Sequence, residues 1–173
     1  MEVCKLDLDG IKIFIPPINK DSRGSFTEKL NINQVNGFNI KQINQSISHK
    51  NVFRGFHFQK NPKEQAKYVW VERGAILDIV INIQPDSPDY KKHLIIELTD
   101  SNNYHLLIPK GFAHGFISLY DNSKVSYAVD NFYSMEYDTG INYMDESLQI
   151  DWPIDLESLI VSDKDKHLPM LQK

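Results

Sequence analysis

Polar side chains interrupt an otherwise apolar stretch at residues 52–59, VFRGFHFQ. Its polar members are Arg54, His57 and Gln59, and their alternation with apolar residues is typical of a β-strand. A buried polar group without a partner costs roughly 1–3 kcal/mol, so a strand that directs such groups inward is expected to use them. A histidine suits proton transfer because its unperturbed pKa lies close to neutral pH. His57 is therefore the first candidate for a general base, and the alternative is a histidine that only satisfies a neighbouring carbonyl group.

A second histidine lies in a glycine-rich stretch at residues 108–116, IPKGFAHGF. Gly111 and Gly115 flank His114 and indicate a tight turn or a close approach of two backbone segments. Two interpretations of His114 stay open at this point. It is either a functional group or a histidine at the end of a strand in a glycine-rich corner.

The two stretches together fit the pattern of cupins, which are small β-barrels with a His-x-His and Glu motif followed by Pro-x-Gly-x-x-His. This chain supplies His57, Glu64 and the segment from Pro109 to His114, but Gln59 stands where the pattern has its second histidine. A metal cupin needs about three or four nitrogen and oxygen ligands on one ion. The amide therefore favours a metal-free barrel in which His57 transfers protons and Gln59 occupies the slot of the missing ligand.

Two further residues could do chemistry, but the sequence does not single them out. Tyr127, in KVSYAVDNFY, shares a face with Val125 and Val129 by strand alternation, so core packing explains it as well. Asp165 lies in a charged run near the C-terminus, VSDKDKHLP, and such runs are usually solvated.

Short strands are the elements that must position these groups. Apolar runs bounded by Gly, Pro, Asn and Asp predict strands at 11–16, 52–59, 66–74, 75–83, 93–98, 104–109, 114–119 and 124–133. Helical periodicity is weak, and only the segment 155–166 is expected to hold a short helix. We therefore expect an all-β, cupin-like jelly-roll β-barrel with short C-terminal helical segments, formed as a single domain over residues 1–173.

Composition excludes several classes of protein. The net charge is −4 and no basic cluster exceeds two adjacent residues, which argues against a nucleic-acid partner. Cys4 is the only cysteine, so the chain has no internal disulfide. No apolar run approaches the roughly 20 residues of a membrane span, and the first residues lack the order of a signal peptide. We expect a cytoplasmic protein with no membrane partner.

A series of segments resembles the dTDP-4-dehydrorhamnose 3,5-epimerase family, metal-free cupins that act on nucleotide-linked 4-keto sugars. The matching segments, in chain order, are RGSFTE, QINQSIS, RGFHFQ, QAKYVWVERGAILDIVINI, SPDY, LLIPKGFAHGF, YAVDNFY, IDWP and the final Ser-x-Lys-Asp-x-x-x-Pro-x-Leu. Each segment is weak alone, but their order over nearly the whole chain is specific.

The resemblance implies an isomerase that uses neither a cofactor nor a metal. It implies His57 as the catalytic base, Asp165 as the carboxylate that orients it, Tyr127 as the opposing general acid and Lys67 beside the keto oxygen. It also implies a nucleotide-sugar substrate bound by Arg23, Glu28, Gln42, Ile43, Asn44, Arg54, His114, Tyr133, Asp138 and Lys164, with Tyr133 stacked on the base. Members of the family are generally homodimers, so Arg23 and Glu28 are expected to serve a neighbouring chain.

Departures from the family pattern leave the substrate open. Asp138 stands where the family often has a glutamate, a tryptophan is missing after residues 87–89, and YMDES replaces WNDP. The substrate is expected to be a dTDP-linked hexose or a GDP-linked heptose, with inversion at carbon 3 alone or at carbons 3 and 5. The alternatives are a metal-dependent cupin that uses His57, Glu64 and His114, a nucleotide-sugar 3,4-ketoisomerase, and a sugar-nucleotide-binding barrel without catalysis.

Overall fold

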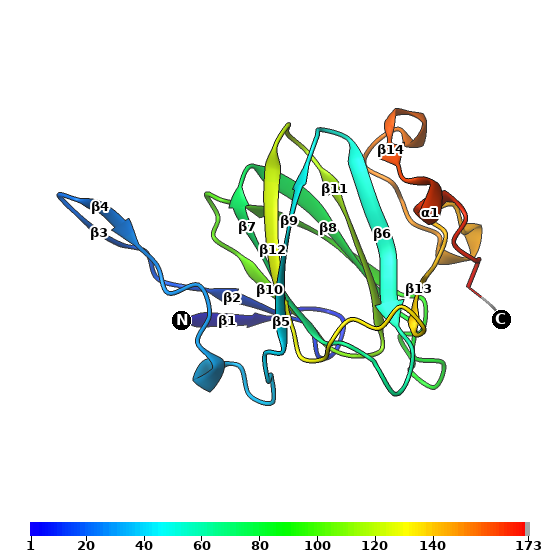
Figure 1. Ribbon diagram of the computed structural model, residues 1–173, viewed down its shortest axis with the longest axis horizontal. Coiled ribbons are helices and arrows are strands. Elements are labelled where there is room, and N and C mark those ends of the chain that lie inside the picture. Colours follow the sequence, from blue (N-terminus) through cyan, green and yellow to red (C-terminus); the bar gives the residue numbers. More distant parts are fainter. Residues whose placement is uncertain (172–173) are drawn as a thin grey trace.

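Two facing β-sheets form the body of the protein, whose computed structural model describes residues 1–171 (Figure 1). The first sheet has the order β1 (Glu2–Lys5), β2 (Lys12–Ile15), β10 (His105–Ile108), β7 (Lys67–Arg73), β12 (Ser123–Val129), β5 (Gln42–Ser48). The second has the order β13 (Asp138–Gly140), β6 (Val52–Gln59), β11 (Phe112–Ser118), β8 (Ala75–Asn82), β9 (His93–Thr99), and β14 (Ile160–Val161) pairs with β6. This arrangement confirms the expected all-β, jelly-roll fold; positions 172 and 173 of the expected domain lie outside the described residues.

The strands expected from apolar runs are all present, within a few residues at each end. In the described part of the chain, five short strands (β1, β3 (Asn19–Asp21), β4 (Gly24–Phe26), β13 and β14) and the longer β5 were not predicted from the pattern, because they are polar or short. Within residues 1–171, helix is confined to short segments: η1 (Ile32–Gln34), η2 (Glu146–Leu148), η3 (Leu156–Ser158) and α1 (Asp163–Lys166). The last two lie in the segment for which a short helix was expected. None of the helices in the described part of the chain is long and apolar enough to cross a membrane.

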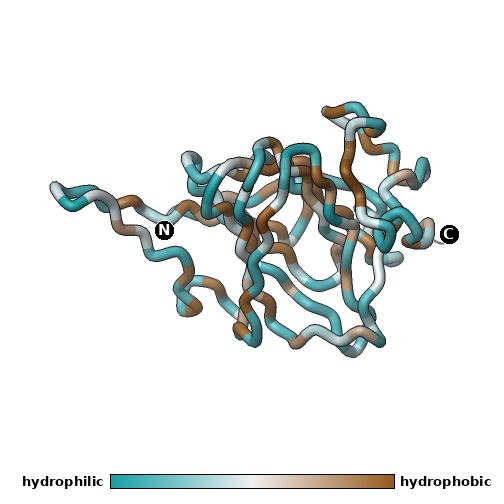
Figure 2. The backbone as a smooth tube through the Cα atoms, turned by 45° about the horizontal axis from the view of Figure 1, so that its top comes forward, coloured by the Kyte–Doolittle hydropathy of each residue, from teal (hydrophilic) through white to brown (hydrophobic). Residues whose placement is uncertain are grey.

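Three apolar clusters hold the layers together. The cluster between the sheets includes Val69 and Val71 of β7 and Val80 of β8, while Tyr68 and Trp70 of β7 face outward into a second cluster. Because both faces of β7 are covered, its run YVWV is buried throughout. Figure 2 shows the corresponding brown stretches along the strands of the barrel.

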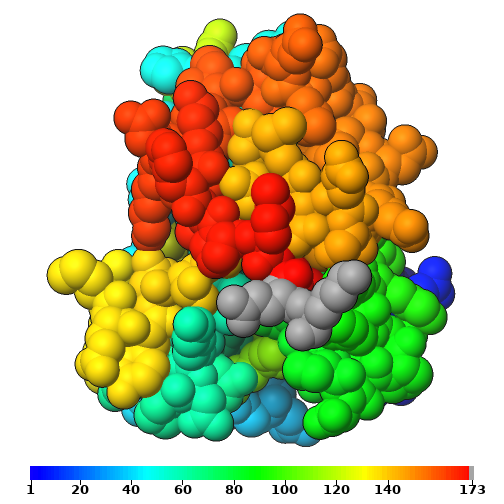
Figure 3. Space-filling view, turned by 90° about the vertical axis from the view of Figure 1, so that its right-hand side faces the viewer, coloured from blue at the N-terminus to red at the C-terminus, as the bar shows by residue number. Residues whose placement is uncertain are grey.

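The third cluster explains why the C-terminal segment lies where it does. Leu148 and Val161 pack with Phe53 and Phe56 on the outer face of the second sheet, and Trp152 contacts both phenylalanine rings. Figure 3 shows this segment, in orange and red, spread over that side of the molecule. The packing brings α1 against β6, at the strand that carries His57.

A β-bulge sets the direction of the polar side chains of β6. His57 pairs with His114 of β11 and Arg54 pairs with Phe116, so two residues of β6 face one residue of β11. Simple alternation would direct Arg54 and His57 to opposite faces, and the extra residue returns them to the same face. Gly55 permits the bulge because its φ is +144° and a Cβ there would lie 2.6 Å from the Cα of Gly115.

One element projects from the body. The hairpin of β3 (Asn19–Asp21) and β4 (Gly24–Phe26) pairs only with itself among the described strands and extends away from the barrel (Figure 1). Figure 2 shows a hydrophilic tip on this arm. Phe26 near its base is 69% exposed, and Arg23 at its tip has an 88% exposed side chain.

Candidate active site

A cavity of about 270 Å³ lies between the sheets at the end of the barrel where β6 ends and β7 begins. Side chains from both sheets and from the C-terminal segment line it: Gln42, Asn44, His57, Gln65, Lys67, Tyr127, Tyr133, Asp138 and Lys164. The four residues expected to transfer or stabilise charge therefore meet here, since Asp165 contacts His57 directly from behind.

The imidazole of His57 is held by a buried carboxylate. Oδ1 of Asp165 lies 2.8 Å from Nε2 of His57, and its Oδ2 accepts the backbone N–H of Gly55 at 3.1 Å. Asp165 is 4% exposed; burial acts to raise its pKa, but the hydrogen bonds from His57 and Gly55 outweigh burial and leave the pKa below its ordinary value. An ionised carboxylate accepts the Nε2–H proton, so Nδ1 carries the free lone pair. Within residues 1–171 Nδ1 has no hydrogen-bond partner, and it is the atom available to act as a base.

The position of Asp165 depends on a short helix. Ser162 caps α1, and its Oγ accepts the backbone N–H of Asp165 at 3.1 Å. Nothing in the local sequence separates Asp165 from its exposed neighbour Asp163. Because β14 pairs with β6, the helix α1 that follows β14 lies next to the strand that carries His57.

Tyr127 reaches the same cavity from the facing sheet. On β12 it pairs with Asn44 of β5 and with Val69 of β7, and its ring packs on the apolar cluster between the sheets. Burial raises the pKa of Tyr127, and the nearby Arg54 acts in the opposite direction. A phenol with a raised pKa stays protonated at neutral pH, so Tyr127 can donate a proton. Tyr127 therefore packs against the core and also lines the cavity, and its role as a general acid stays a prediction.

Lys67 supplies positive charge beside His57. Its Nζ donates to the carbonyl oxygen of His57 at 3.1 Å. Burial lowers the pKa of Lys67 to about 8, while the carboxylates of Asp78 and Asp138 act to raise it. At neutral pH the side chain is an ammonium group in a largely dry position, where it can stabilise a developing negative charge.

The rim of the cavity is a hydrogen-bonded group of polar side chains. Oδ2 of Asp138 accepts from Nζ of Lys164 at 2.6 Å and from the hydroxyl of Tyr133 at 3.2 Å. Oε1 of Gln42 accepts the backbone N–H of Tyr133 at 3.3 Å, and its Nε2 donates to Asn44 at 2.7 Å. Asp138 thus makes these contacts although it is one methylene shorter than the glutamate of the family pattern.

His114 lies behind the cavity and does not line it. It is 8% exposed, and its Nε2 lies 2.9 Å from Oδ2 of Asp78, which is fully buried on β8. Burial lowers the pKa of His114 despite this carboxylate. Sequence reasoning missed Asp78, although an acidic residue within the buried run AILDIVINI is a signal that could have found it.

Several residues expected at the substrate are not among the side chains that line the cavity of the single chain. Ile43 is 61% exposed on the face of β5 opposite to Gln42 and Asn44. Arg23 and Glu28 belong to the projecting arm and its base, outside the cavity lining, and Arg23 pairs with Asp21 at 2.6 Å. Arg54 lies on the cavity side of β6 and donates to Oγ of Ser48 at 3.0 Å.

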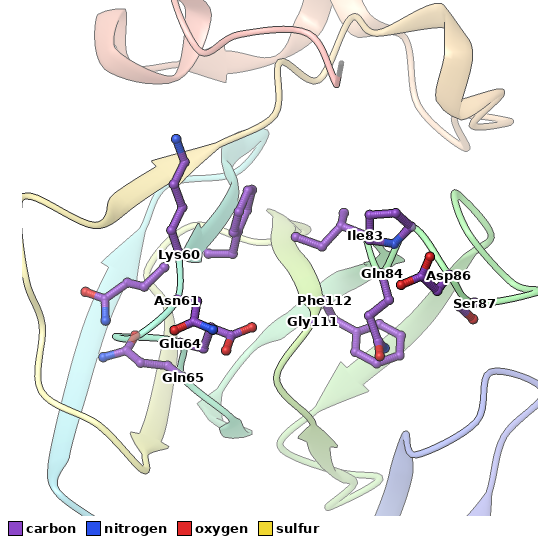
Figure 4. A pocket seen from close by; sticks show the side chains of 13 residues that line it. Lys60, Asn61, Glu64, Gln65, Ile83, Gln84, Asp86, Ser87, Gly111 and Phe112 are labelled. Atoms are coloured by element: carbon purple, nitrogen blue, oxygen red, sulfur yellow. The ribbon is translucent and has the colours of Figure 1, made fainter. Parts of the chain in front are cut away.

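The ligands of a metal-dependent cupin do not come together. Glu64 lines a separate cleft of about 680 Å³, where Figure 4 shows it with Gln65 on the wall that faces Ile83 and Phe112. Among residues 1–171 no group of three or more His, Cys, Asp or Glu side chains is placed to hold a metal ion. The side-chain amide of Gln59 hydrogen-bonds to backbone groups of two loops. In the part of the chain that the structure describes, no set of metal ligands lies beside it, so the structure gives no metal site in which this amide would replace a histidine.

The protein is a jelly-roll barrel with a cavity that is lined by the His57 imidazole from one sheet and the Tyr127 phenol from the other. The imidazole is paired with the carboxylate of Asp165, and this combination is typical of a cupin-type isomerase. The family model for dTDP-4-dehydrorhamnose 3,5-epimerase matches residues 5–173. The chain belongs to this family, and it is accordingly an isomerase of the nucleotide-sugar epimerase type.

Similarity to individual relatives extends over almost the whole chain. It is 40% identical to the dTDP-4-dehydrorhamnose 3,5-epimerase of Methanothermobacter thermautotrophicus, over 98% of this chain and 94% of the relative. The crystal structure of the Bacillus anthracis enzyme with TDP and PPi bound has a TM-score of 0.92 and 40% identity, covering 98% of this chain and 99% of that one. A 3'-monoepimerase from Streptomyces bikiniensis in complex with dTDP-quinovose has a TM-score of 0.88 and 30% identity, covering 96% and 86% of the two chains.

Proposed function

We propose that the protein epimerises a dTDP-linked 4-keto-6-deoxy hexose at carbons 3 and 5 through an enolate intermediate. The observation that carries the proposal is that His57 and Tyr127 line one cavity from facing sheets. A sugar ring between them would meet a base on one side and an acid on the other. The matched relatives are named for dTDP sugars, which favours thymidine diphosphate. They give no support to the GDP-heptose alternative.

The reaction needs only proton transfers. A ketone at carbon 4 acidifies the C–H bonds at carbons 3 and 5, and Nδ1 of His57 would remove one of these protons. The electron pair of the broken C–H bond moves to the carbonyl and makes an enolate, whose oxygen the ammonium of Lys67 would stabilise. Tyr127 would return a proton from its hydroxyl to the opposite face of the same carbon. Exchange with solvent then restores neutral His57 and protonated Tyr127, so no oxidant or reductant is consumed.

Asp165 would serve this step in two ways. It holds Nε2–H in place, which keeps the lone pair on Nδ1, and it stabilises the imidazolium that forms. A well-placed base contributes about 100- to 10,000-fold to a rate of this kind.

The diphosphate and the nucleoside would bind at the rim. Lys164 and Arg54 are cations on the cavity side, and the planar fork of an arginine suits phosphate oxygens. Tyr133 is 54% exposed and would stack on the base. We also propose a homodimer in which Arg23 and Glu28 of the arm complete the site of the partner, because the arm extends away from the barrel (Figure 1) and neither residue lines the cavity of its own chain.

Isotope exchange tests the reaction. The protein is incubated in deuterated water with a dTDP-linked 4-keto-6-deoxy hexose and, separately, with a GDP-linked keto sugar, and NMR follows carbons 3 and 5. We expect deuterium at both carbons with the dTDP sugar and none in the His57→Asn variant. Exchange at carbon 3 alone would establish a 3-epimerase, and exchange with neither sugar would overturn the proposal. Movement of the carbonyl from carbon 4 to carbon 3 would instead establish a ketoisomerase.

Mixed dimers test the arm. Arg23→Ala and His57→Asn are expected to be inactive separately, whereas a refolded equal mixture regains about a quarter of the wild-type sites if each arm serves its partner. Activity that stays absent in a mixture shown to contain the mixed dimer would contradict the shared site.

A further inference from the structure

Gln59 is a buried amide whose hydrogen bonds all go to main-chain groups of two loops. Its Nε2 donates to the carbonyl oxygens of Lys63 at 2.6 Å and Phe132 at 3.2 Å. Its Oε1 accepts the backbone N–H of Ser134 at 2.6 Å. The residue is 4% exposed, so these bonds compete little with water.

The loop contacts of Gln59 lie on both sides of Tyr133. Phe132 and Ser134 are its chain neighbours, and Gln65 donates to the carbonyl of the preceding Asn131 at 2.8 Å. Within residues 1–171, the hydrogen bond of the Tyr133 side chain is the one from its hydroxyl to Asp138, and more than half of the residue is exposed. Together with the bond that Oε1 of Gln42 accepts from the N–H of Tyr133, the bonds of Gln59 and Gln65 to the neighbouring backbone therefore set where this ring stands at the rim of the cavity.

Only an amide of this length can make the three bonds together. It offers two N–H donors and one oxygen acceptor, whereas a glutamate carboxylate has no donor and would place negative charge against two carbonyl oxygens. An asparagine keeps the donors and the acceptor but is one methylene shorter.

We propose that Gln59 is a positioning residue that holds Tyr133 where it can stack on the nucleobase of the substrate. This inference rests on the proposed function for the stacking step. The hold on residues 131–134 is a property of the free protein and can be measured separately. It also assigns a use to an amide at a position where metal-binding cupins have a histidine.

The hold on the loop is tested by hydrogen exchange of the free protein. Gln59→Glu and Gln59→Asn are compared with Gln45→Glu, which makes the same chemical change on an exposed face of β5. We expect faster amide exchange in residues 131–134 for both Gln59 variants and wild-type exchange there for Gln45→Glu. Wild-type amide exchange at residues 131–134 in a folded Gln59→Asn protein would overturn the proposal, independently of any catalytic activity.

The consequence for the nucleotide is tested by calorimetric titration with dTDP. Loss of the stacking between a base and an aromatic ring weakens binding by about 5- to 150-fold. We expect the Kd for dTDP to rise about tenfold in Tyr133→Ala and in Gln59→Glu. If Gln59 acts through Tyr133, the double variant binds dTDP no more weakly than Tyr133→Ala. The KM of the exchange reaction should rise with Kd, while kcat changes less than about threefold.

Each outcome of the titration has a definite meaning. An equal tenfold loss when Gln59→Glu is added to Tyr133→Ala shows that Gln59 acts independently of Tyr133 and overturns the positioning role. Unchanged dTDP affinity in Gln59→Glu overturns it as well. A wild-type protein that neither binds dTDP nor catalyses exchange overturns the proposed function and the stacking step with it, and the amide-exchange result still decides whether Gln59 holds the loop.

Discussion

Nε2 of His57 and Oδ1 of Asp165 lie 2.8 Å apart, although 108 positions separate the two residues in the chain. The imidazole lies on β6, and the carboxylate lies on the last helix, within the C-terminal segment that covers the outer face of the second sheet. The pair joins the inner cavity to an outer layer that is held by apolar packing, by the pairing of β14 with β6 and by hydrogen bonds of Asn142 and Asp145. The stability of that outer layer is therefore coupled to the tautomer of the base.

Asp165→Asn is expected to lower kcat by about 100- to 10,000-fold. An asparagine amide can donate to Nε2, which moves the ring proton to Nδ1 and removes the lone pair that faces the cavity. Steady-state epimerisation measures the effect. Asp163→Asn, an exposed neighbour on the same helix, should retain wild-type kcat. An Asp165→Asn enzyme within threefold of wild type would show that the carboxylate does not set the tautomer.

Tyr127→Phe should separate proton removal from proton return. The phenylalanine keeps the packing against the inter-sheet cluster but has no hydroxyl to deliver a proton. We expect deuterium still to enter the substrate on the His57 side, with inversion reduced at least about 100-fold. NMR of the sugar measures both quantities in one sample, and Tyr120→Phe at an exposed position is the control. Equal loss of exchange and inversion would contradict an acid role that is separate from the base.

The alkaline limb of the pH–rate profile should follow Lys67. Burial lowers its pKa to about 8, so the ammonium form and the activity that depends on it are present below about pH 8 and are lost as the pH rises through that value. Asp78 acts to raise this pKa, and Asp78→Asn should therefore shift the limb to lower pH.

Profiles of kcat/KM, which report the groups of the free enzyme, measure the shift for both proteins, and Glu64→Gln in the neighbouring cleft is the control. An alkaline limb that stays in place in Asp78→Asn would assign it to another group.

Gly55→Ala should destabilise the protein far more than Gly24→Ala. Both glycines have positive φ, which costs a residue with a Cβ about 1–2 kcal/mol. A Cβ at Gly24 meets nothing within 4 Å, whereas at Gly55 it lies 2.6 Å from a backbone atom of Gly115. We expect a loss of more than about 3 kcal/mol in the free energy of unfolding for Gly55→Ala, since overpacking adds its own cost. Urea unfolding of the two variants measures the difference, and equal losses would show that the bulge tolerates a methyl group.

Local pattern was enough to predict most strands and the fold class, because alternation and turn residues are properties of neighbouring positions. β6 coincides with its apolar run from Val52 to Gln59. The order of motifs also pointed to His57, Lys67 and Tyr127, and all three line the cavity. The unpredicted strands are short or polar, as in the arm and in β13, and their pairing partners decide them.

Tertiary structure alone decided which groups meet. A bulge that depends on contact with β11 puts Arg54 on the side of His57, and no pattern within β6 indicates it. Asp165 and Asp163 look alike in the sequence, and only packing of the last segment buries one of them. Ile43 belongs to a matching motif yet faces outward, because a strand turns alternate side chains to opposite faces. Sequence types and spacing supply the chemical groups, whereas long-range pairing sets the distances on which proton transfer depends.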